Sequence, residues 1–468
     1  MTVLAAFRQK LRGRAAGPSF LAELRSVLAE RGFRRLFATR LISQAGDGAF
    51  TAGVGAYVFF NKTTFPNPGA AAAAFAVLYL PYSLIGPFAG VFIDRWSRRQ
   101  ILVRAALIRA VFVVVTASLV ASGRLGLPLY VSVLAVLGVN RFFLSSLSAA
   151  LPHVVAEDKL VMANAMSPTL GTVVTFIGGL AGLGVHFATG GGRGGSALTL
   201  LAAGACYLLA AGVGATMRRD LLGPPPVTGD AARAGLLTEL STVAEGLISG
   251  ARHVWRRRPV AAALAATGCH RLLYGTLLLM TLLLYRNYFY PTSANKSLAQ
   301  FTLVIIASAV GYGAAAIITP MATRRLAKPT LITVLLAAGG IVAGVLGPTF
   351  SQVPFVVIGF ALGVVAQGVA ICATTIIQEM MEDSFRGRVF SLYDMLFNVP
   401  FVVGAAGSAL IMPLNGRSFP LIAFVAVGYL VAAGAYLVLG RQALGGRPPA
   451  SEPPVPESPS STAQASSS

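Results

Sequence analysis

The chain has 468 residues, of which 55% are hydrophobic and only 11% are charged, and its mean hydropathy is +0.73. Soluble domains carry about 25% charged residues, so this composition excludes an ordinary cytosolic enzyme and indicates a membrane protein. The formal net charge of +21 would also suit a protein that binds nucleic acid. The positions of the basic residues must therefore decide what that charge means.

Twelve apolar segments follow one another along the chain. They are 36–60, 70–93, 101–122, 128–150, 164–188, 196–216, 260–285, 298–322, 328–348, 353–378, 389–413 and 418–440. Each has about 20 residues or more, which is enough for a helix to cross a hydrocarbon core of about 30 Å. The longest polar break, 217–259, separates six segments from six. We therefore expect an all-α membrane protein with 12 transmembrane helices in two pseudo-symmetric six-helix bundles, 36–216 and 260–440, a plan common among secondary transporters.

Three further stretches flank and join the two predicted bundles. Residues 1–35 form a cytoplasmic segment in which 18–35 has the spacing of an amphipathic helix on the membrane surface or, equally, of a solvated helical leader. The linker 217–259 contains an amphipathic, basic stretch at 236–258. The cytoplasmic tail 441–468 is rich in Pro and Ser from Gly445 onward, and such a composition is typical of disorder.

The basic residues are distributed unequally between the two sides of the predicted membrane. With the N-terminus in the cytoplasm, 26 of the 37 Lys and Arg residues lie in cytoplasmic segments, six lie in the opposite loops and five lie within spans. This is the positive-inside asymmetry, so we expect both termini in the cytoplasm and no nucleic-acid partner. The 32 Arg against five Lys, with abundant Ala and Gly, indicate GC-rich coding DNA and hence a bacterial plasma (inner) membrane.

The sequence offers little for catalysis. Its three cysteines, Cys206, Cys269 and Cys372, are odd in number and widely spaced, which favours neither a disulfide framework nor a metal site. A GxxxxGK[ST] loop for ATP, a spaced His/Asp/Glu metal cluster and a nucleophile elbow are all absent from the sequence. We expect no enzyme activity, no metal and no cofactor.

The most specific string in the chain follows the second apolar segment. It reads Gly86-Pro-Phe-Ala-Gly-Val-Phe-Ile-Asp-Arg-Trp-Ser-Arg-Arg99. Gly90 permits close helix approach, and Asp94 can meet the positive N-terminus of another helix. With Arg95, Arg98 and Arg99 they form a candidate cytoplasmic gate. A plain positive-inside loop would need the three arginines but neither Gly90 nor Asp94.

This string, G-x-x-x-D-R-x-x-R-R between the second and third segments, resembles the signature loop of the major facilitator superfamily. Leu41-Ile-Ser-Gln-Ala-Gly-Asp47, Asn140-Arg-Phe-Phe143 and Arg386-Gly-Arg-Val-Phe-Ser-Leu392 are similar to strings of its macrolide-efflux and enterobactin-exporter branch. The resemblance covers most of the chain. It implies the superfamily's fold, alternating access and export, and a latch in which Asp94 caps the start of the eleventh helix near Arg388.

Two acidic residues, Asp47 and Asp394, lie clearly inside apolar segments. An ionisable side chain in a span costs roughly 2.5–3.5 kcal/mol to insert, so it faces a cavity or a partner. Four polar residues share one face of the first predicted helix, because they are spaced i, i+4, i+7 and i+11. They are Arg40, Gln44, Asp47 and Thr51, and we expect this face to point into a polar cavity. We hypothesise that Asp47, with Arg40, is the proton-coupling site. The alternative is a static pair of Asp47 with an arginine that locks helices together.

Other polar residues near mid-span are candidates for the substrate cavity. They are Gln44, Arg141, His270, Arg271, Tyr274, Gln367, Asp394 and Asn398. Five arginines against two aspartates within spans would suit an anionic or zwitterionic substrate. The four charged residues expected to surround one central cavity are Asp47, Arg141, Arg271 and Asp394. Alternatively, the arginines cap carbonyls at helix ends or pair with Asp394 and Glu379.

These features favour a secondary active transporter that exports an amphiphilic small molecule, such as a drug or a siderophore-like compound, in exchange for protons. We expect it to act as a monomer in the lipid bilayer. The fifth segment is glycine-rich, as in antiporters of the superfamily, but it lacks their Gly-Pro pair, so close helix packing explains it equally well. The alternatives are a lipid or lysolipid flippase on the same fold and a non-transporting membrane scaffold or sensor.

Overall fold

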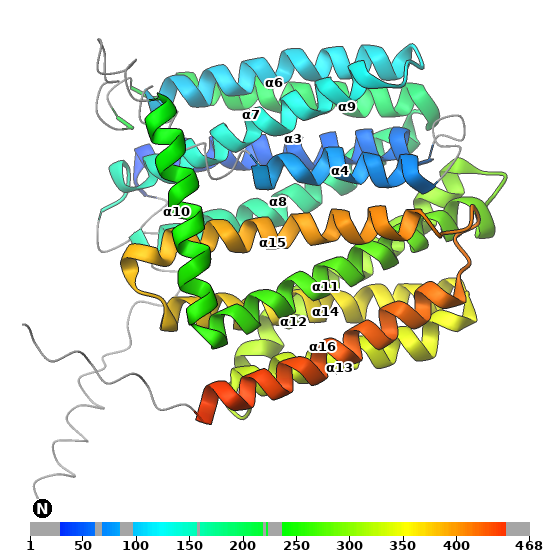
Figure 1. Cartoon of the computed structure of the whole chain (residues 1–468). Coiled ribbons are helices and arrows are strands. Elements are labelled where there is room, and N and C mark those ends of the chain that lie inside the picture. The colour runs from blue at the N-terminus through cyan, green and yellow to red at the C-terminus, as the bar shows by residue number, and fades with distance from the viewer. Residues whose placement is uncertain are drawn as a thin grey trace, which may run out of the picture.

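The computed structural model of the chain describes residues 29–60, 68–84, 97–156, 160–218, 221–222 and 236–445. These ranges are helical almost throughout, and the helices lie side by side in two groups (Figure 1). The N-terminal group contains α3 (Arg31–Phe60), α4 (Pro68–Leu84), α6 (Arg98–Ala121), α7 (Leu127–Ala150), α8 (Leu160–Ala188) and α9 (Gly192–Ala215), with a short 3-10 turn, η2 (Leu151–His153).

The C-terminal group contains the other six long helices. They are α11 (Arg258–Leu283), which continues into the π-helical turn η5 (Leu284–Phe289), α12 (Ala294–Ala322), α13 (Lys328–Leu346) with the turn η6 (Gly347–Thr349), α14 (Gln352–Met380), α15 (Asp383–Ala409) and α16 (Phe419–Gly445). Between the two groups, α10 (Leu236–Arg256) forms the helix predicted at 236–258.

The predicted all-α fold with two six-helix bundles is confirmed, because each predicted span coincides with one of these twelve helices. Ten helices in the described ranges are long and apolar enough to cross a membrane. The other two are α3, whose first turns carry Arg31, Arg34 and Arg35, and α4, which is described only to Leu84. The predicted residues 85–93 of the second span lie outside the described part of the chain.

Several helix boundaries differ from the sequence prediction by four to six residues, for example those of α15 (383–409 against 389–413). Residues 31–35 belong to the predicted leader at 18–35, yet they form the first turns of α3, because this helix continues without a break into the bundle. At the other end, α16 continues to Gly445, five residues past the predicted end of the span at 440. The rest of the leader, residues 1–28, and the tail 446–468 lie outside the described residues.

The pairing of helices is the same in both bundles. In the N-terminal bundle α3 packs against α8 and α9, α6 packs against α7 and α9, and α4 packs against α7. Six helices further along, α11 packs against α15 and α16, α13 packs against α14 and α16, and α12 packs against α14. The two halves therefore repeat one arrangement, as in transporters built from duplicated six-helix units.

The two bundles meet mainly through α4 and α15, which face each other across the divide (Figure 1), and to a smaller extent through α3 with α12 and α11 with α4. Helix α10 crosses the ends of both bundles (Figure 1) and packs against α11 and α15. Its Ser249 accepts a hydrogen bond of 3.2 Å from Arg388 of α15. We call this end of the molecule the α10 end. We call the opposite end the far end; it contains the connections 122–126, 189–191 and 290–293.

Helices α11 and α15 approach each other so closely that glycine is required at their contact. A Cβ added to Gly275 would collide with the carbonyl oxygen of Phe401, and one added to Gly404 would collide with the carbonyl oxygen of Leu272. The hydroxyl of Thr276 donates a hydrogen bond of 3.0 Å to the carbonyl oxygen of Gly404 across the same contact. Small residues thus bring the two backbones together, as is common between membrane helices.

We predict that Gly275→Ala destabilises the protein by about 1–3 kcal/mol, the usual cost of overpacking a close contact. The expected result is a lower melting temperature of the purified protein in lipid nanodiscs. Gly313→Ala is the matched control, because nothing lies within 4 Å of a Cβ at this position of α12. Equal melting temperatures for the two variants would contradict the close contact between α11 and α15.

Candidate functional site

Asp47 lies on α3 and faces the interior of the N-terminal bundle. Its carboxylate forms an ion pair with Arg109 of α6 and accepts hydrogen bonds from the hydroxyl of Tyr207 on α9, at 2.9 Å, and from the side-chain amide of Asn140 on α7, at 3.2 Å. Four helices therefore converge on one carboxylate. This arrangement satisfies the charge inside the bundle, as the insertion cost of an ionisable group requires.

Arg109 is the charged partner that the sequence left undecided. Its side chain is only 1% exposed, its Nη1 donates a hydrogen bond of 2.9 Å to Ser43, and its guanidinium lies 3.7 Å from the ring centre of Tyr207. A cation over an aromatic face is stabilised by the ring quadrupole. The sequence signal for Arg109 was its position well inside the third apolar segment. An arginine there is better placed to pair with a buried carboxylate than to extend its side chain to the membrane surface.

Arg40 and Gln44 belong to a second polar contact, separate from that of Asp47. The Nε of Arg40 donates a hydrogen bond of 3.0 Å to Gln44, and its Nη1 donates one of 3.1 Å to Ser167 of α8. The predicted stripe on α3 is therefore divided. Arg40 and Gln44 bind toward α8, Asp47 binds toward α6, α7 and α9, and Thr51 lines a cavity between the bundles.

Gln367 and Asp394 line one cavity in the C-terminal bundle. Its volume is about 350 Å³, and its other polar lining residues are Tyr312, Thr374 and Tyr393. Arg141 of α7, in the other bundle, is close enough to attract the Asp394 carboxylate electrostatically. The structure therefore brings three predicted cavity residues together across the divide between the bundles.

Asn398 lies one turn after Asp394 on α15. Its side-chain amide donates a hydrogen bond of 3.1 Å to the carbonyl oxygen of Asp394, so this predicted cavity residue is bound within its own helix. The amide thereby supports the backbone next to the carboxylate that lines the cavity.

The three predicted residues on α11 point to different neighbours. Arg271 donates from Nε to the carbonyl oxygen of Phe397 and lies 4.1 Å from the ring centre of that residue. His270 is buried, with its Nδ1 2.9 Å from the hydroxyl of Tyr429 on α16. Tyr274 is half-buried, with its hydroxyl 3.4 Å from that of Ser308 on α12. Arg271 thus binds a backbone carbonyl in the middle of α15, and not one at a helix end as the alternative in the sequence analysis expected.

In the described part of the chain, Asp47 is separate from the other three charges that were expected around a single cavity. Arg141 lies near Asp394, and Arg271 contacts Phe397, which lines the same cavity as Asp394, whereas Asp47 is bound to Arg109 within the N-terminal bundle. The physical reason is local, because each buried charge is satisfied by the nearest partner on an adjacent helix. A one-dimensional pattern shows which face of a helix carries a charge but not which helix lies opposite.

The structure also reveals a largely apolar cavity of about 340 Å³ between the bundles. Its walls come from α3, α4 and α8 on one side and from α11 and α12 on the other, and they include Thr51, Phe59, Phe75, Thr175, Leu278 and Phe301. The only sequence signal for this cavity was a run of small residues on α3, at Gly48, Ala52 and Gly55. They lie opposite phenylalanines of α4 and α12.

Aromatic residues close the divide between the bundles on the far-end side of this cavity. The ring centres of Phe60 on α3 and Phe301 on α12 are 5.5 Å apart. Phe401 on α15 lies 5.6 Å from Phe75 and 4.7 Å from Tyr79, both on α4. These contacts join helices of the two bundles directly.

The predicted gate is described only in part. Gly90, Asp94 and Arg95 lie outside the described residues. Arg98 donates a hydrogen bond of 3.2 Å to the carbonyl oxygen of Leu222, and Arg99 donates one of 2.6 Å to that of Ala215. Both arginines therefore bind backbone carbonyls at the α10 end of the N-terminal bundle, where cations favour the negative ends of helices.

Comparisons with known proteins find relatives along nearly the whole chain. An uncharacterized MFS-type transporter of Mycobacterium tuberculosis is 35% identical over 424 residues, covering 89% of this chain and 93% of that protein, and one of Mycobacterium bovis has the same identity and coverage. A search against models of protein families finds no match.

Solved transporter structures share the fold. The peptide transporter POT in complex with sulfate has a TM-score of 0.64 at 14% identity, covering 88% of this chain and 95% of its own. The nucleoside transporter NupG has a TM-score of 0.56 at 14% identity, covering 88% and 97%. A bacterial homologue of the human lysosomal transporter Spinster, inward-facing and unoccupied, has a TM-score of 0.60 at 12% identity, covering 88% and 98%. These likenesses confirm the predicted fold.

We predict that Arg109→Gln strongly destabilises the protein, because it leaves the Asp47 carboxylate without its charged partner. Breaking a buried ion pair by removing one member costs about 3–5 kcal/mol. The double variant Asp47→Asn/Arg109→Gln should recover much of the loss, since neither charge remains. Melting temperatures in nanodiscs measure the effect, and Arg104→Gln, an exposed arginine of the same helix, is the control. A double variant less stable than Arg109→Gln alone would contradict the pairing.

Proposed function

Because the chain belongs to the major facilitator superfamily, we propose that it is a secondary active transporter that moves an amphiphilic small molecule across the membrane by alternating access. The observation that carries this proposal is the cavity of about 340 Å³ whose walls come from both bundles. A site between two repeated units can open to either side of the membrane when the units rock against each other. Its volume lies in the range of small-molecule sites.

The composition of the cavity walls supports an amphiphilic substrate. Phenylalanine and leucine side chains line most of the cavity, while the hydroxyls of Thr51, Thr175 and Tyr79 supply a few polar groups. A separate cavity, in the C-terminal bundle, contains the amide of Gln367 and the carboxylate of Asp394, with Arg141 close by. An apolar body with a small number of polar groups matches this lining, because ligand sites combine apolar walls with few, well-placed polar groups.

We assign the proton-coupling role to Asp47. When its carboxyl is protonated, the ion pair with Arg109 is lost, and the contacts that hold α3 to α6, α7 and α9 weaken. The next residues along α3, Gly48 and Thr51, line the substrate cavity. A change of protonation is thereby linked to a cavity wall through one helix, and Arg40 with its bond to Ser167 couples the same helix to α8.

The proposal also includes the orientation of the protein in the membrane and the direction of transport. Of the Lys and Arg residues outside the spans that the structure describes, more lie at the α10 end than at the far end, so we place this end and both termini in the cytoplasm of a bacterium, following the positive-inside rule. We propose export, on the basis of the resemblance of the chain to macrolide and enterobactin exporters. The contacts between Phe60 and Phe301 and between Phe75 and Phe401 join the two bundles on the far-end side of the apolar cavity, which supports entry of the substrate from the cytoplasmic side.

We predict that Asp47→Asn reduces flux driven by a pH gradient at least tenfold, because the amide cannot bind and release a proton. The measurement uses proteoliposomes with radiolabelled erythromycin, enterobactin or dodecanoate, with and without an imposed gradient. Exchange of substrate at equal pH should persist, which separates lost coupling from lost folding. The stable double variant Asp47→Asn/Arg109→Gln provides a second test of the same point.

Asp394→Asn is the comparison for this experiment, because it removes the other in-span carboxyl. We expect it to change the apparent affinity for substrate while the response to the gradient remains. Full gradient-driven transport by Asp47→Asn would contradict the coupling role and would leave the Asp47–Arg109 pair as a static link between helices.

A further inference from the structure

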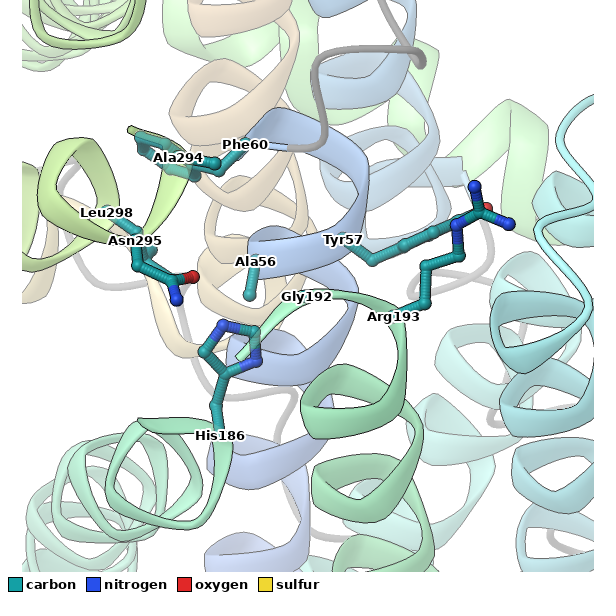
Figure 2. A pocket seen from close by; sticks show the side chains of 9 residues that line it. All are labelled: Ala56, Tyr57, Phe60, His186, Gly192, Arg193, Ala294, Asn295 and Leu298. Atoms are coloured by element: carbon teal, nitrogen blue, oxygen red, sulfur yellow. The ribbon is translucent and has the colours of Figure 1, made fainter. Parts of the chain in front are cut away.

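A second cavity lies at the far end, between the bundles. It has a volume of about 300 Å³, and Figure 2 shows its lining: Ala56, Tyr57 and Phe60 of α3, His186 of α8, Gly192 and Arg193 of α9, and Ala294, Asn295 and Leu298 of α12. Three of these residues, Ala56, Phe60 and Leu298, also line the apolar cavity of about 340 Å³. The two cavities therefore adjoin, and the far-end cavity has the polar side chains of Tyr57, His186, Arg193 and Asn295 in its lining.

The polar cavity is bordered by the beginning of a helix with unsatisfied donors. Helix α9 begins at Gly192, and its preceding residue, Gly191, offers no side chain to cap the first turn. The first backbone N–H groups of a helix have no partner within the helix, and together with the helix dipole they favour an anion. Gly191 has a φ of 72°, and its missing Cβ leaves room for the side chain of Asn295 from the other bundle.

Two side chains in this cavity reinforce its preference for an anion. Tyr57 is 2% exposed, and its hydroxyl has no hydrogen-bond partner in the described part of the chain. Arg193 lies close enough to Tyr57 to influence it electrostatically, and Figure 2 shows the two side chains side by side. A buried hydroxyl without a partner costs free energy, so a ligand that accepts a hydrogen bond from Tyr57 beside the Arg193 cation would satisfy it.

On the other side of the cavity, the side chains of His186 and of Asn295 from α12 face each other (Figure 2). The Nδ1 of His186 also lies 3.3 Å from the hydroxyl of Ser196. The contact between His186 and Asn295 joins the two bundles beside the cavity. It holds the polar lining in place while the donors of Tyr57 and α9 stay available to a ligand.

The charge of the connecting segments at the far end also favours an anionic ligand. The connecting segments that the structure describes at this end, residues 122–126, 189–191, 290–293, 347–351 and 410–418, contain no Asp or Glu. The basic residues in or next to them are Arg124, Arg193, Arg286, Lys296 and Arg417. A surface that carries charge of one sign attracts ligands of the opposite sign, which here are anions.

We propose that the two adjoining cavities form one site for a single-chain amphiphile with an anionic head, a carboxylate or a phosphate. The head lies in the far-end cavity, where it accepts hydrogen bonds from Tyr57, Arg193 and the first N–H groups of α9. The chain lies in the apolar cavity beside Gly55, Phe75 and Phe301. A small polar anion would leave the apolar cavity unfilled, and a neutral amphiphile would bring no negative charge to the Arg193 cation. Movement of this ligand across the membrane rests on the proposed function, whereas its binding does not.

The test measures binding to the full-length protein in phosphatidylcholine nanodiscs, whose lipids carry no net negative charge. The probes are radiolabelled dodecanoate and 1-dodecanoyl lysophosphatidate, which share the chain and differ in the head. Dodecanol tests the chain alone, and acetate and inorganic phosphate test the head alone. Empty nanodiscs correct for partition into the lipid, and scintillation proximity gives the dissociation constants.

The first pair of variants tests the head. Arg193→Gln should weaken the binding of both anionic probes about tenfold, the effect of losing one hydrogen bond to a charged group, and should leave dodecanol unchanged. Arg124→Gln removes the same charge from the same end, outside the cavity lining, and should bind like the wild type. Binding of lysophosphatidate without dodecanoate would identify the head as a phosphate. Equal effects of the two substitutions on both probes would overturn the proposal.

The second pair tests the chain. Gly55→Leu fills the apolar cavity from α3, where a Cβ meets only Phe59 at 3.9 Å, and should weaken dodecanoate, lysophosphatidate and dodecanol alike. Gly184→Leu, at an exposed position of α8 with nothing within 4 Å, should not. Acetate or phosphate that binds as tightly as the long-chain probes would also overturn the proposal. No gradient is present, so these outcomes are independent of coupling at Asp47.

Discussion

A carboxylate and a guanidinium buried in an apolar bundle must find each other, because neither can be left without a partner at membrane depth. The pair of Asp47 and Arg109 meets this requirement and fixes α3 and α6 in register. Tyr207 and Asn140 donate further hydrogen bonds to the two oxygens of the same carboxylate. The position of α3 within the N-terminal bundle thus depends on one charge being satisfied from three neighbouring helices.

Helix α3 connects this charge to the space between the bundles. One of its faces carries Asp47 toward α6, α7 and α9, and another carries Gly48, Thr51 and Gly55 into the apolar cavity. A change in the charge of Asp47 therefore acts on the same rigid element that forms a cavity wall. This is the physical basis on which we link proton binding to substrate movement, since coupling requires one element whose position both events influence.

The far end shows how the two bundles can close without a continuous seal of side chains. Aromatic pairs such as Phe60 with Phe301 join the helices, and the missing side chain of Gly191 admits Asn295 from the opposite bundle. Because α9 begins at the same point, its free N–H groups and Arg193 border the space that remains. The contact between the bundles and the proposed preference for an anion thus have a common origin in the short connection between α8 and α9.

The sequence by itself determined the elements and their order. Apolar length, the polar break at 217–259 and the asymmetry of basic residues gave twelve helices in two groups of six, because the bilayer imposes these features on any spanning chain. It also identified Asp47 and Asp394 as charges within spans. It could not supply their partners, since Arg109 and Tyr207 lie 62 and 160 residues from Asp47. Only the tertiary structure decided that Arg40 binds Ser167 rather than Asp47, and that an apolar cavity lies between the bundles, because both depend on which helix faces which.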